Sequence, residues 1–262
     1  MKPKVLVIRT AGTNCDKETE FAFSSAGANT TLRHINYIKQ KDELSDYQII
    51  CIPGGFSYGD DLGAGKILAL EFICWFKNSL KKFVAQGGLI LGICNGFQVL
   101  VKTGILPDLD FKQKVTLTNN DSGRFEDRWV YLKIRNQKSE IRNQKREIES
   151  VWLEGLPEVF NLPVAHGEGK FYAERSILDK IEVSGQVALR YVDQNSQPKG
   201  YPFNPNGSLN NIAGITDASG RILGLMPHPE RCIFRHHSPF WKEREVYPWG
   251  LKFFANAISY FK

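Results

Sequence analysis

A cysteine that sits between two glycines is the residue of this chain best suited to chemistry. In the stretch LILGICNGFQVL, residues 89–100, Gly92 precedes Cys94 by two positions and Gly96 follows it by two. The apolar run before the cysteine predicts a strand, and FQVLVK after it predicts a helix. So sharp a turn strains the central residue and leaves no room for side chains beside it. The pattern predicts a nucleophile elbow carrying the Cys94 thiol, and a buried structural cysteine is the alternative.

A histidine and a glutamate near the C-terminus complete the candidate site. In LMPHPER, residues 225–231, Met226 and His228 each precede a proline, which pushes both into an extended conformation. Residues i and i+2 of an extended chain point to the same side, so His228 and Glu230 can converge. A thiol nucleophile, an imidazole base and a carboxylate that orients the base would then follow in the order Cys94, His228, Glu230. An HPE triplet alone is a weak signal, and its combination with the elbow makes it specific.

A glycine-rich loop supplies candidate donors for an oxyanion hole. PGGFSYGD, residues 53–60, follows a short apolar segment. Sites in open α/β sheets lie beyond the carboxyl ends of the strands, which brings this loop beside Cys94. The N–H of Gly55 or Phe56, with that of Asn95, would hold the oxyanion, and each such donor is typically worth ~10²–10³ in rate. A plain turn after a strand is the alternative.

Apolar segments alternate with helical patterns in the first part of the chain. Strands are expected at 5–8, 30–38, 48–52 and 89–93, and helices at 17–27 and 63–86. This alternation predicts an α/β fold with a doubly wound, mainly parallel sheet flanked by helices. From about residue 115 the pattern changes to short strands separated by turn residues, with a hairpin loop at 217–220 and a C-terminal helix at 249–261. No Pro/Ser-rich linker divides the chain, so we expect one domain over residues 1–262.

The composition limits the class of protein. Hydrophobic residues make up 42% and charged residues 24% of the 262 residues, as in ordinary globular proteins. No apolar run approaches 18 residues, so no membrane span is expected. The five cysteines, an odd number without CxxC spacing, argue against a disulfide framework or a zinc site and favour a cytoplasmic location. His236 and His237 have no acidic or cysteine partner at suitable spacing, so no metal site is expected.

The net charge of +6 is concentrated in one duplicated segment. Residues 135–148 read RNQKSEI and then RNQKREI, with five basic and two acidic residues, so they contribute half of the excess. No aromatic residues interleave with these charges to stack on bases. We therefore interpret the segment as a charged, solvated insertion and expect no nucleic-acid partner.

Motifs along nearly the whole chain resemble those of the class I glutamine amidotransferases, whose fold is flavodoxin-like. The resemblance is carried by GICNGFQVL, PGGFSYGD and LMPHPER, and it continues through NNDSGRFEDRWV, PVAHGEGKFY, YPFNPNGS and NIAGITDASGRILG. It implies hydrolysis of glutamine to glutamate and ammonia through a Cys–His–Glu triad and a thioester. It also implies that Gln98, His166 and Gly167 meet the substrate, which the Gly54–Gly55 pair would let the backbone approach closely. On the residues alone, His166 is either a loop histidine or a rival base.

Within that family, the closest resemblance is to glutaminases of purine biosynthesis. These would supply ammonia to an ATP-dependent synthetase subunit that makes formylglycinamidine ribonucleotide, and a small third subunit would take part. The chain has no GxxxxGK[ST] phosphate loop, so we expect no cofactor in it and assign ATP and Mg to the partner. Three alternatives stay open: another Cys–His–Glu hydrolase such as a peptidase or γ-glutamyl hydrolase, a glutaminase for a different synthetase, and a non-catalytic scaffold.

Deleting one copy of the duplication, residues 135–141, should leave folding and glutaminase chemistry intact. Ile134, Ile141 and Ile148 recur every seven residues, a stripe too narrow to bury a helix. The remainder has the composition of a solvated loop, and loop length costs only ~0.6 kcal/mol per doubling. Binding of the full-length and shortened chains to the synthetase, measured at low and high salt, checks this. A large loss confined to low salt would instead identify a basic docking arm.

Overall fold

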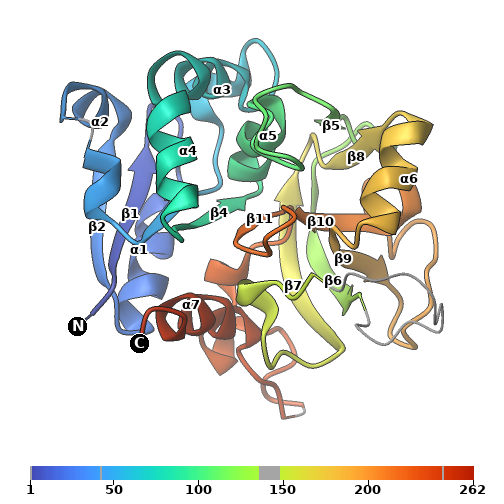
Figure 1. The fold of residues 1–262 in the computed structure, drawn as a ribbon. Helices are drawn as coiled ribbons and strands as arrows, with labels where there is room; N and C mark the ends of the chain where they lie inside the picture. The colour runs from blue at the N-terminus through green and yellow to red at the C-terminus, as the bar shows by residue number, and fades with distance from the viewer. Residues whose placement is uncertain (1, 42, 136–147, 244) are drawn as a thin grey trace.

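The computed structural model describes residues 2–41, 43–135, 148–243 and 245–262, which form a mixed sheet covered by helices (Figure 1). Within these residues the main sheet has nine strands in the order β2-β1-β3-β4-β11-β10-β9-β6-β7, and β5 pairs with β8 separately. The strands are β1 (Lys4–Arg9), β2 (Asn29–His34), β3 (Ile49–Ile52), β4 (Leu89–Ile93), β5 (Val115–Thr118), β6 (Glu126–Ile134), β7 (Val159–His166), β8 (Lys170–Ala173), β9 (Val187–Val192), β10 (Ile212–Thr216) and β11 (Ile222–Leu225).

The half of the sheet from β2 to β11 is parallel throughout. Its central strands β3 and β4 are buried along their whole length, because helices cover both faces and leave no polar side for the solvent. The continuous apolar runs in the sequence reflect this double burial. The carboxyl ends of β3, β4 and β11 therefore meet at one edge, and each is followed by a loop that carries candidate site residues.

The other half of the sheet, from β10 to β7, is antiparallel. The change of pattern after about residue 115 predicted short strands in this half, but β6 has nine residues and β7 has eight, more than any strand of the parallel half. The hairpin that joins β10 to β11 lies where the sequence placed it, and the N–H of Gly220 donates to the carbonyl oxygen of Asp217 at 3.2 Å. The antiparallel half lies beside the parallel one through the β10–β11 pair, and it brings β7 to the site.

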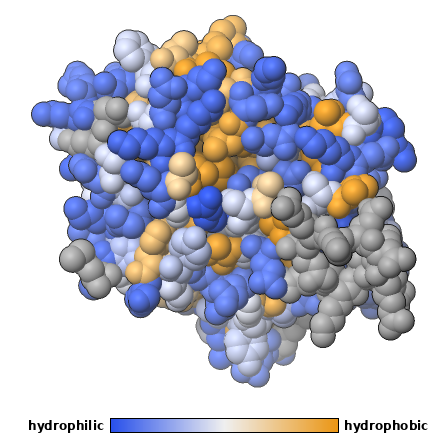
Figure 2. Space-filling model, viewed as in Figure 1, coloured by the Kyte–Doolittle hydropathy of each residue, from blue (hydrophilic) through white to orange (hydrophobic). Residues whose placement is uncertain are grey.

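Helices cover the sheet, with α4 and α5 on one side and α7 on the other (Figure 1). Helix α5 packs on β3, β4 and β11, while α7 packs on β7 and α1. On the face seen in Figure 2, hydrophilic residues predominate and apolar ones gather near the middle. No helix of the described residues is long and apolar enough to cross a membrane. The helices are α1 (Asp16–Ser25), α2 (Ile35–Lys41), α3 (Lys66–Glu71), α4 (Lys77–Ala85), α5 (Asn95–Lys102), α6 (Arg175–Val183) and α7 (Trp249–Ser259).

Several elements differ from the sequence-based expectations, and neither β8 nor α6 was predicted. The strand expected over 30–38 ends at His34, because Ile35 and Ile38 are both buried at the spacing of a helix face and form α2. The expected helix over 63–86 is two helices, α3 and α4, joined by a π-helical turn at Phe72–Phe76. Strand β7 was not predicted, and it contains a proline, a residue that weakens a strand signal. The duplication lies mostly outside the described residues, which stop at 135 and resume at 148.

Candidate active site

Cys94 occupies a sharp turn between β4 and α5. Its backbone has φ 51° and ψ −104°, a conformation that a residue with a side chain adopts only under constraint from its surroundings. Its N–H donates to the carbonyl oxygen of Leu225 in β11 at 2.8 Å, which fixes the turn to the sheet. The thiol stands at the carboxyl end of β4, and the N–H of Asn95 opens the helix directly after it.

The two flanking glycines are required sterically. A Cβ on Gly96 would lie 1.9 Å from the carbonyl oxygen of Ile52 in β3, and one on Gly92 would lie 2.7 Å from the carbonyl oxygen of Gly96. No Cβ tolerates such contacts, so β3, β4 and α5 approach this closely only with glycine at both positions. The elbow geometry predicted from the spacing is confirmed.

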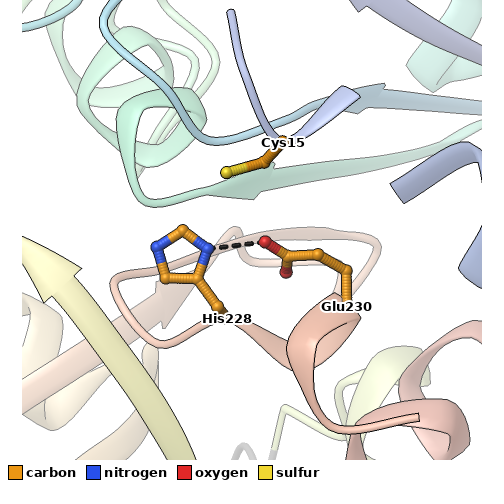
Figure 3. Close-up of side chains that lie close together, drawn as sticks. All are labelled: Cys15, His228 and Glu230. Carbon is orange, nitrogen blue, oxygen red and sulfur yellow. Dashed lines mark hydrogen bonds and ion pairs between the residues drawn. The ribbon is translucent and has the colours of Figure 1, made fainter. Parts of the chain in front are cut away.

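His228 and Glu230 lie together in the turn after β11, where Pro229–Arg231 form the 3-10 helix η6 (Figure 3). Nδ1 of His228 is 2.5 Å from Oε1 of Glu230, and both side chains are buried. Burial lowers the pKa of His228, but the charges of Glu230 and Cys94 outweigh it and hold that pKa well above its ordinary value. Nε2 of His228 has no hydrogen-bond partner among the residues the structure describes. That nitrogen is therefore available for proton transfer.

The end of β7 lies against both Cys94 and His228. The Cys94 thiol donates to the carbonyl oxygen of Ala165 at 3.6 Å, and the N–H of His228 donates to that of Pro163 at 2.8 Å. Strand β7 ends at His166, so His166 and Gly167 lie directly after the residue that contacts the thiol. The resemblance assigns these two residues to glutamine binding. The contact depends on a strand that the sequence did not predict.

The glycine-rich loop after β3 lies beside the same histidine. A Cβ on Gly54 would lie 2.8 Å from Cε1 of His228, so glycine lets the imidazole pack against the backbone. Gly55 has φ 143°, which disfavours any side chain, while the N–H of Phe56 donates to the carbonyl oxygen of Gly12 at 2.9 Å. The expected meeting of this loop with the site is confirmed.

Side-chain amides of α5 tie the elbow to two loops. The Asn95 amide donates to Asp60 at 3.1 Å and to Oε1 of Gln98 at 2.9 Å, and it accepts from the N–H of Ser57 at 3.2 Å. The Gln98 amide donates to the carbonyl oxygen of Glu168 at 2.6 Å. Both amide side chains are buried, so these bonds hold the loops in a defined position beside Cys94. The sequence alone did not single out this connection.

His166 is enclosed between two asparagines. Its Nδ1 lies 3.1 Å from Oδ1 of Asn120 and its Nε2 lies 3.4 Å from the Asn206 amide nitrogen. Burial, with a smaller contribution from the charge of His228, lowers the pKa of His166 to about 3. A neutral imidazole with both nitrogens engaged is a poor general base, so the geometry favours His228 in that role. Asn120 and Asn206 lie in the NND and NPNGS motifs, whose contact with His166 the sequence could not reveal.

A second thiol, that of Cys15, lies beside the His228–Glu230 pair (Figure 3). Cys15 precedes α1 and is buried, and its Sγ accepts a hydrogen bond from the Arg231 guanidinium at 3.1 Å. Burial is the main cause that raises the pKa of the Cys15 thiol. Its backbone has φ −97°, without the strain found at Cys94. The structure thus brings a second cysteine to the site.

Comparison with known proteins assigns the fold and the family. Residues 2–261 match the CobB/CobQ-like glutamine amidotransferase domain. The chain is a member of that family, and its sheet and helices have the glutamine amidotransferase fold. A Thermotoga maritima glutamine amidotransferase of known structure, 14% identical with a TM-score of 0.55, shares the fold.

The chain also matches individual relatives over nearly its full length. The chain is 45% identical over 264 residues to the phosphoribosylformylglycinamidine synthase subunit PurQ of Dehalococcoides mccartyi, covering 99% of this chain and 98% of the relative. It is 40% identical over 279 residues to the PurQ subunit of Methanococcus maripaludis strain C5, covering 100% and 99%. A chain in the structure of PurLQS from Thermotoga maritima matches it with a TM-score of 0.73 and 30% identity over the full length of both.

Proposed function

We propose that this chain is the glutaminase subunit of a phosphoribosylformylglycinamidine synthase. The observation that carries the proposal is the strained turn at Cys94, whose thiol interacts with the imidazole of the buried His228–Glu230 pair. Nucleophile, base and orienting carboxylate come from two separate loops that follow β4 and β11, so their meeting is a property of the fold. The full-length similarity to PurQ subunits supports the particular enzyme.

The first half of the reaction uses Cys94 and His228. The Cys94 thiolate attacks the side-chain amide carbon of glutamine, and the proton is held at Nε2 of His228. Glu230 accepts the hydrogen on Nδ1, which fixes the tautomer and stabilises the imidazolium. His228 then delivers its Nε2 proton to the leaving ammonia, and a thioester to Cys94 remains.

The negative charge that develops on the amide oxygen is held by backbone N–H groups. We assign the N–H of Asn95, at the start of α5, as one donor. Gly55 is the better candidate for the second, because the N–H of Phe56 already donates to Gly12. Gly54, Gln98, His166 and Gly167 form the proposed glutamine-binding wall, in which the buried Gln98 and His166 act chiefly by holding the loop backbone in place.

The second half of the reaction hydrolyses the thioester. His228, neutral after releasing ammonia, takes a proton from a water molecule at Nε2, and the hydroxide attacks the thioester carbonyl. The same N–H groups hold the second oxyanion, and glutamate leaves as the Cys94 thiolate re-forms. No step needs a cofactor or a metal in this chain.

The ammonia goes to a synthetase subunit. We propose that this partner uses ATP and Mg to convert formylglycinamide ribonucleotide to its amidine in de novo purine biosynthesis, with a small third subunit in the complex and a cytoplasmic location. The matching Thermotoga maritima chain belongs to a structure of PurLQS, which supports an assembly of this composition. The intact triad argues against a non-catalytic scaffold.

Glutamine hydrolysis measured with and without the synthetase subunit tests this function. We expect glutamate formation to couple to amidine formation when the PurL-type partner, ATP and formylglycinamide ribonucleotide are present. Ammonium should replace glutamine as the nitrogen source only in the presence of the partner. Hydrolysis of peptides or γ-glutamyl chains in preference to glutamine would contradict the assignment.

A further inference from the structure

Three buried side chains beside the proposed active site form a set of metal-ligating atoms. Cys15, His228 and Glu230 each present one ligand-type atom, and these atoms lie within 4.8 Å of one another (Figure 3). Each of the three residues is no more than 2% exposed. They come from the loop before α1 and the turn after β11, so the fold assembles them from distant parts of the sequence.

A buried oxygen of Glu230 without a hydrogen-bond donor indicates that this cluster can accept a cation. Oε2 of Glu230 is buried and has no hydrogen-bond partner among the described residues, whereas Oε1 is taken by His228. A buried carboxylate oxygen without a donor is costly, because it has lost its water and gained nothing in exchange. A cation bound next to it would supply the missing interaction.

We propose that Cys15, His228 and Glu230 bind a zinc-type divalent cation that reversibly inhibits the enzyme. A thiolate, an imidazole and a carboxylate form a donor set that zinc accepts readily and that magnesium does not. A tetrahedral zinc ion with bonds of about 2.0–2.3 Å separates its ligands by roughly 3.3–3.7 Å. Sγ of Cys15, Nδ1 of His228 and Oε2 of Glu230, the carboxylate oxygen without a donor, would be the three protein ligands.

Metal binding releases protons from the ligands and involves no change of oxidation state. The Cys15 thiol and Nδ1 of the His228 imidazolium each release a proton to the solvent, while bonds from the ion to sulfur, nitrogen and oxygen form. Arg231 gives up its hydrogen bond to Cys15 and keeps its bond to Glu18 at 3.0 Å.

The expected consequence is loss of the base. With the metal on Nδ1 and hydrogen on Nε2, the His228 imidazole has no lone pair to take a proton from the attacking water. The site therefore opposes catalysis, and the ion is an inhibitor and not a cofactor. The proposal depends on this cluster and goes beyond the glutaminase function.

Direct zinc binding by the full-length chain tests the proposal. We would use the Cys94→Ala variant, in which the nucleophile thiol cannot bind the ion, and measure Zn²⁺ by competition with a chromogenic chelator. One equivalent should bind. Loss of a residue that only hydrogen-bonds to a metal ligand costs about 10–100-fold in metal affinity, so removing a ligand itself with Cys15→Ser should weaken binding by at least about 100-fold. Cys232→Ser, which removes a buried thiol outside the cluster, should leave binding unchanged.

Cobalt supplies a second, spectroscopic readout of the same site. Co²⁺ bound to the Cys94→Ala protein should show a thiolate-to-metal charge-transfer band that Cys15→Ser removes. Absence of that band, unchanged zinc affinity on Cys15→Ser, or loss of binding on Cys232→Ser would each overturn the proposal. Because these measurements require no turnover, they succeed or fail independently of the glutaminase assignment.

Inhibition is measured as a ratio within each variant. In the complex with the synthetase, the rate with Zn²⁺ divided by the rate without it should be low for the unmodified chain and recover on adding a chelator. The same ratio should approach one for Cys15→Ser. Equal zinc sensitivity of the two chains would show that the ion acts elsewhere, such as at Cys94, and would contradict the proposal.

Discussion

Replacing Cys94 by alanine is expected to lower glutamine hydrolysis by at least ~10³-fold, the largest effect of any single substitution in this chain. The thiolate forms the covalent intermediate, so without it only substrate binding and the oxyanion donors can contribute to catalysis. The measurement is glutamate release by the purified chain and by its complex with the synthetase. Because alanine is smaller and apolar, the elbow should keep its geometry, and a comparison of thermal unfolding controls for this.

Two comparisons make the Cys94 result specific. The complex containing Cys94→Ala should still make the amidine from added ammonium, because the acceptor reaction belongs to the partner. Cys15→Ala serves as the matched control, since it removes a buried thiol beside the same histidine without touching the elbow. Near-normal hydrolysis by Cys94→Ala, or its loss in Cys15→Ala alone, would show that the nucleophile has been assigned to the wrong cysteine.

His228→Ala is expected to be nearly as damaging as loss of the thiol. Nucleophile and base act as one unit, so removing either residue costs nearly as much of the rate as removing both. The raised pKa of His228, which the charges of Glu230 and Cys94 sustain against burial, reflects the same coupling. Steady-state hydrolysis of glutamine by the three proteins, unmodified, Cys94→Ala and His228→Ala, gives the comparison.

Glu230→Gln should reduce the rate less than His228→Ala does. Glutamine keeps the size of the side chain and a possible hydrogen bond to Nδ1, and it removes the negative charge that stabilises the imidazolium. If Glu230→Gln were the slower enzyme, the roles given to the two residues would have to be exchanged. The ammonium-dependent reaction again separates loss of catalysis from loss of assembly.

The catalytic turn was predictable because its constraint is local. Gly92 and Gly96 are required by contacts with β3 and α5 that any strand–turn–helix elbow makes, so the spacing around Cys94 reports the geometry directly. The parallel half of the sheet was predictable for a similar reason, since its doubly buried strands are apolar throughout. Sites in such sheets lie at the carboxyl ends of the strands, and this rule predicted that the loop after β3 lies beside Cys94.

Contacts between distant segments could not be predicted in the same way. The asparagines that hold His166 and the approach of Cys15 to His228 depend on the three-dimensional packing of loops far apart in the chain. Nothing in the short motif GTNCD indicates that its thiol meets an HPE triplet more than 200 residues later. Strand β7 escaped prediction because its proline weakened the strand pattern.

Labelling with an electrophilic glutamine analogue tests the central claim most directly. The analogue should form one covalent adduct per chain, and peptide mass spectrometry should locate it on Cys94. Glutamine should protect against labelling, and His228→Ala should slow it. An adduct on Cys15, or no stoichiometric adduct at all with the synthetase present, would contradict the assignment of this chain as a cysteine-dependent glutaminase.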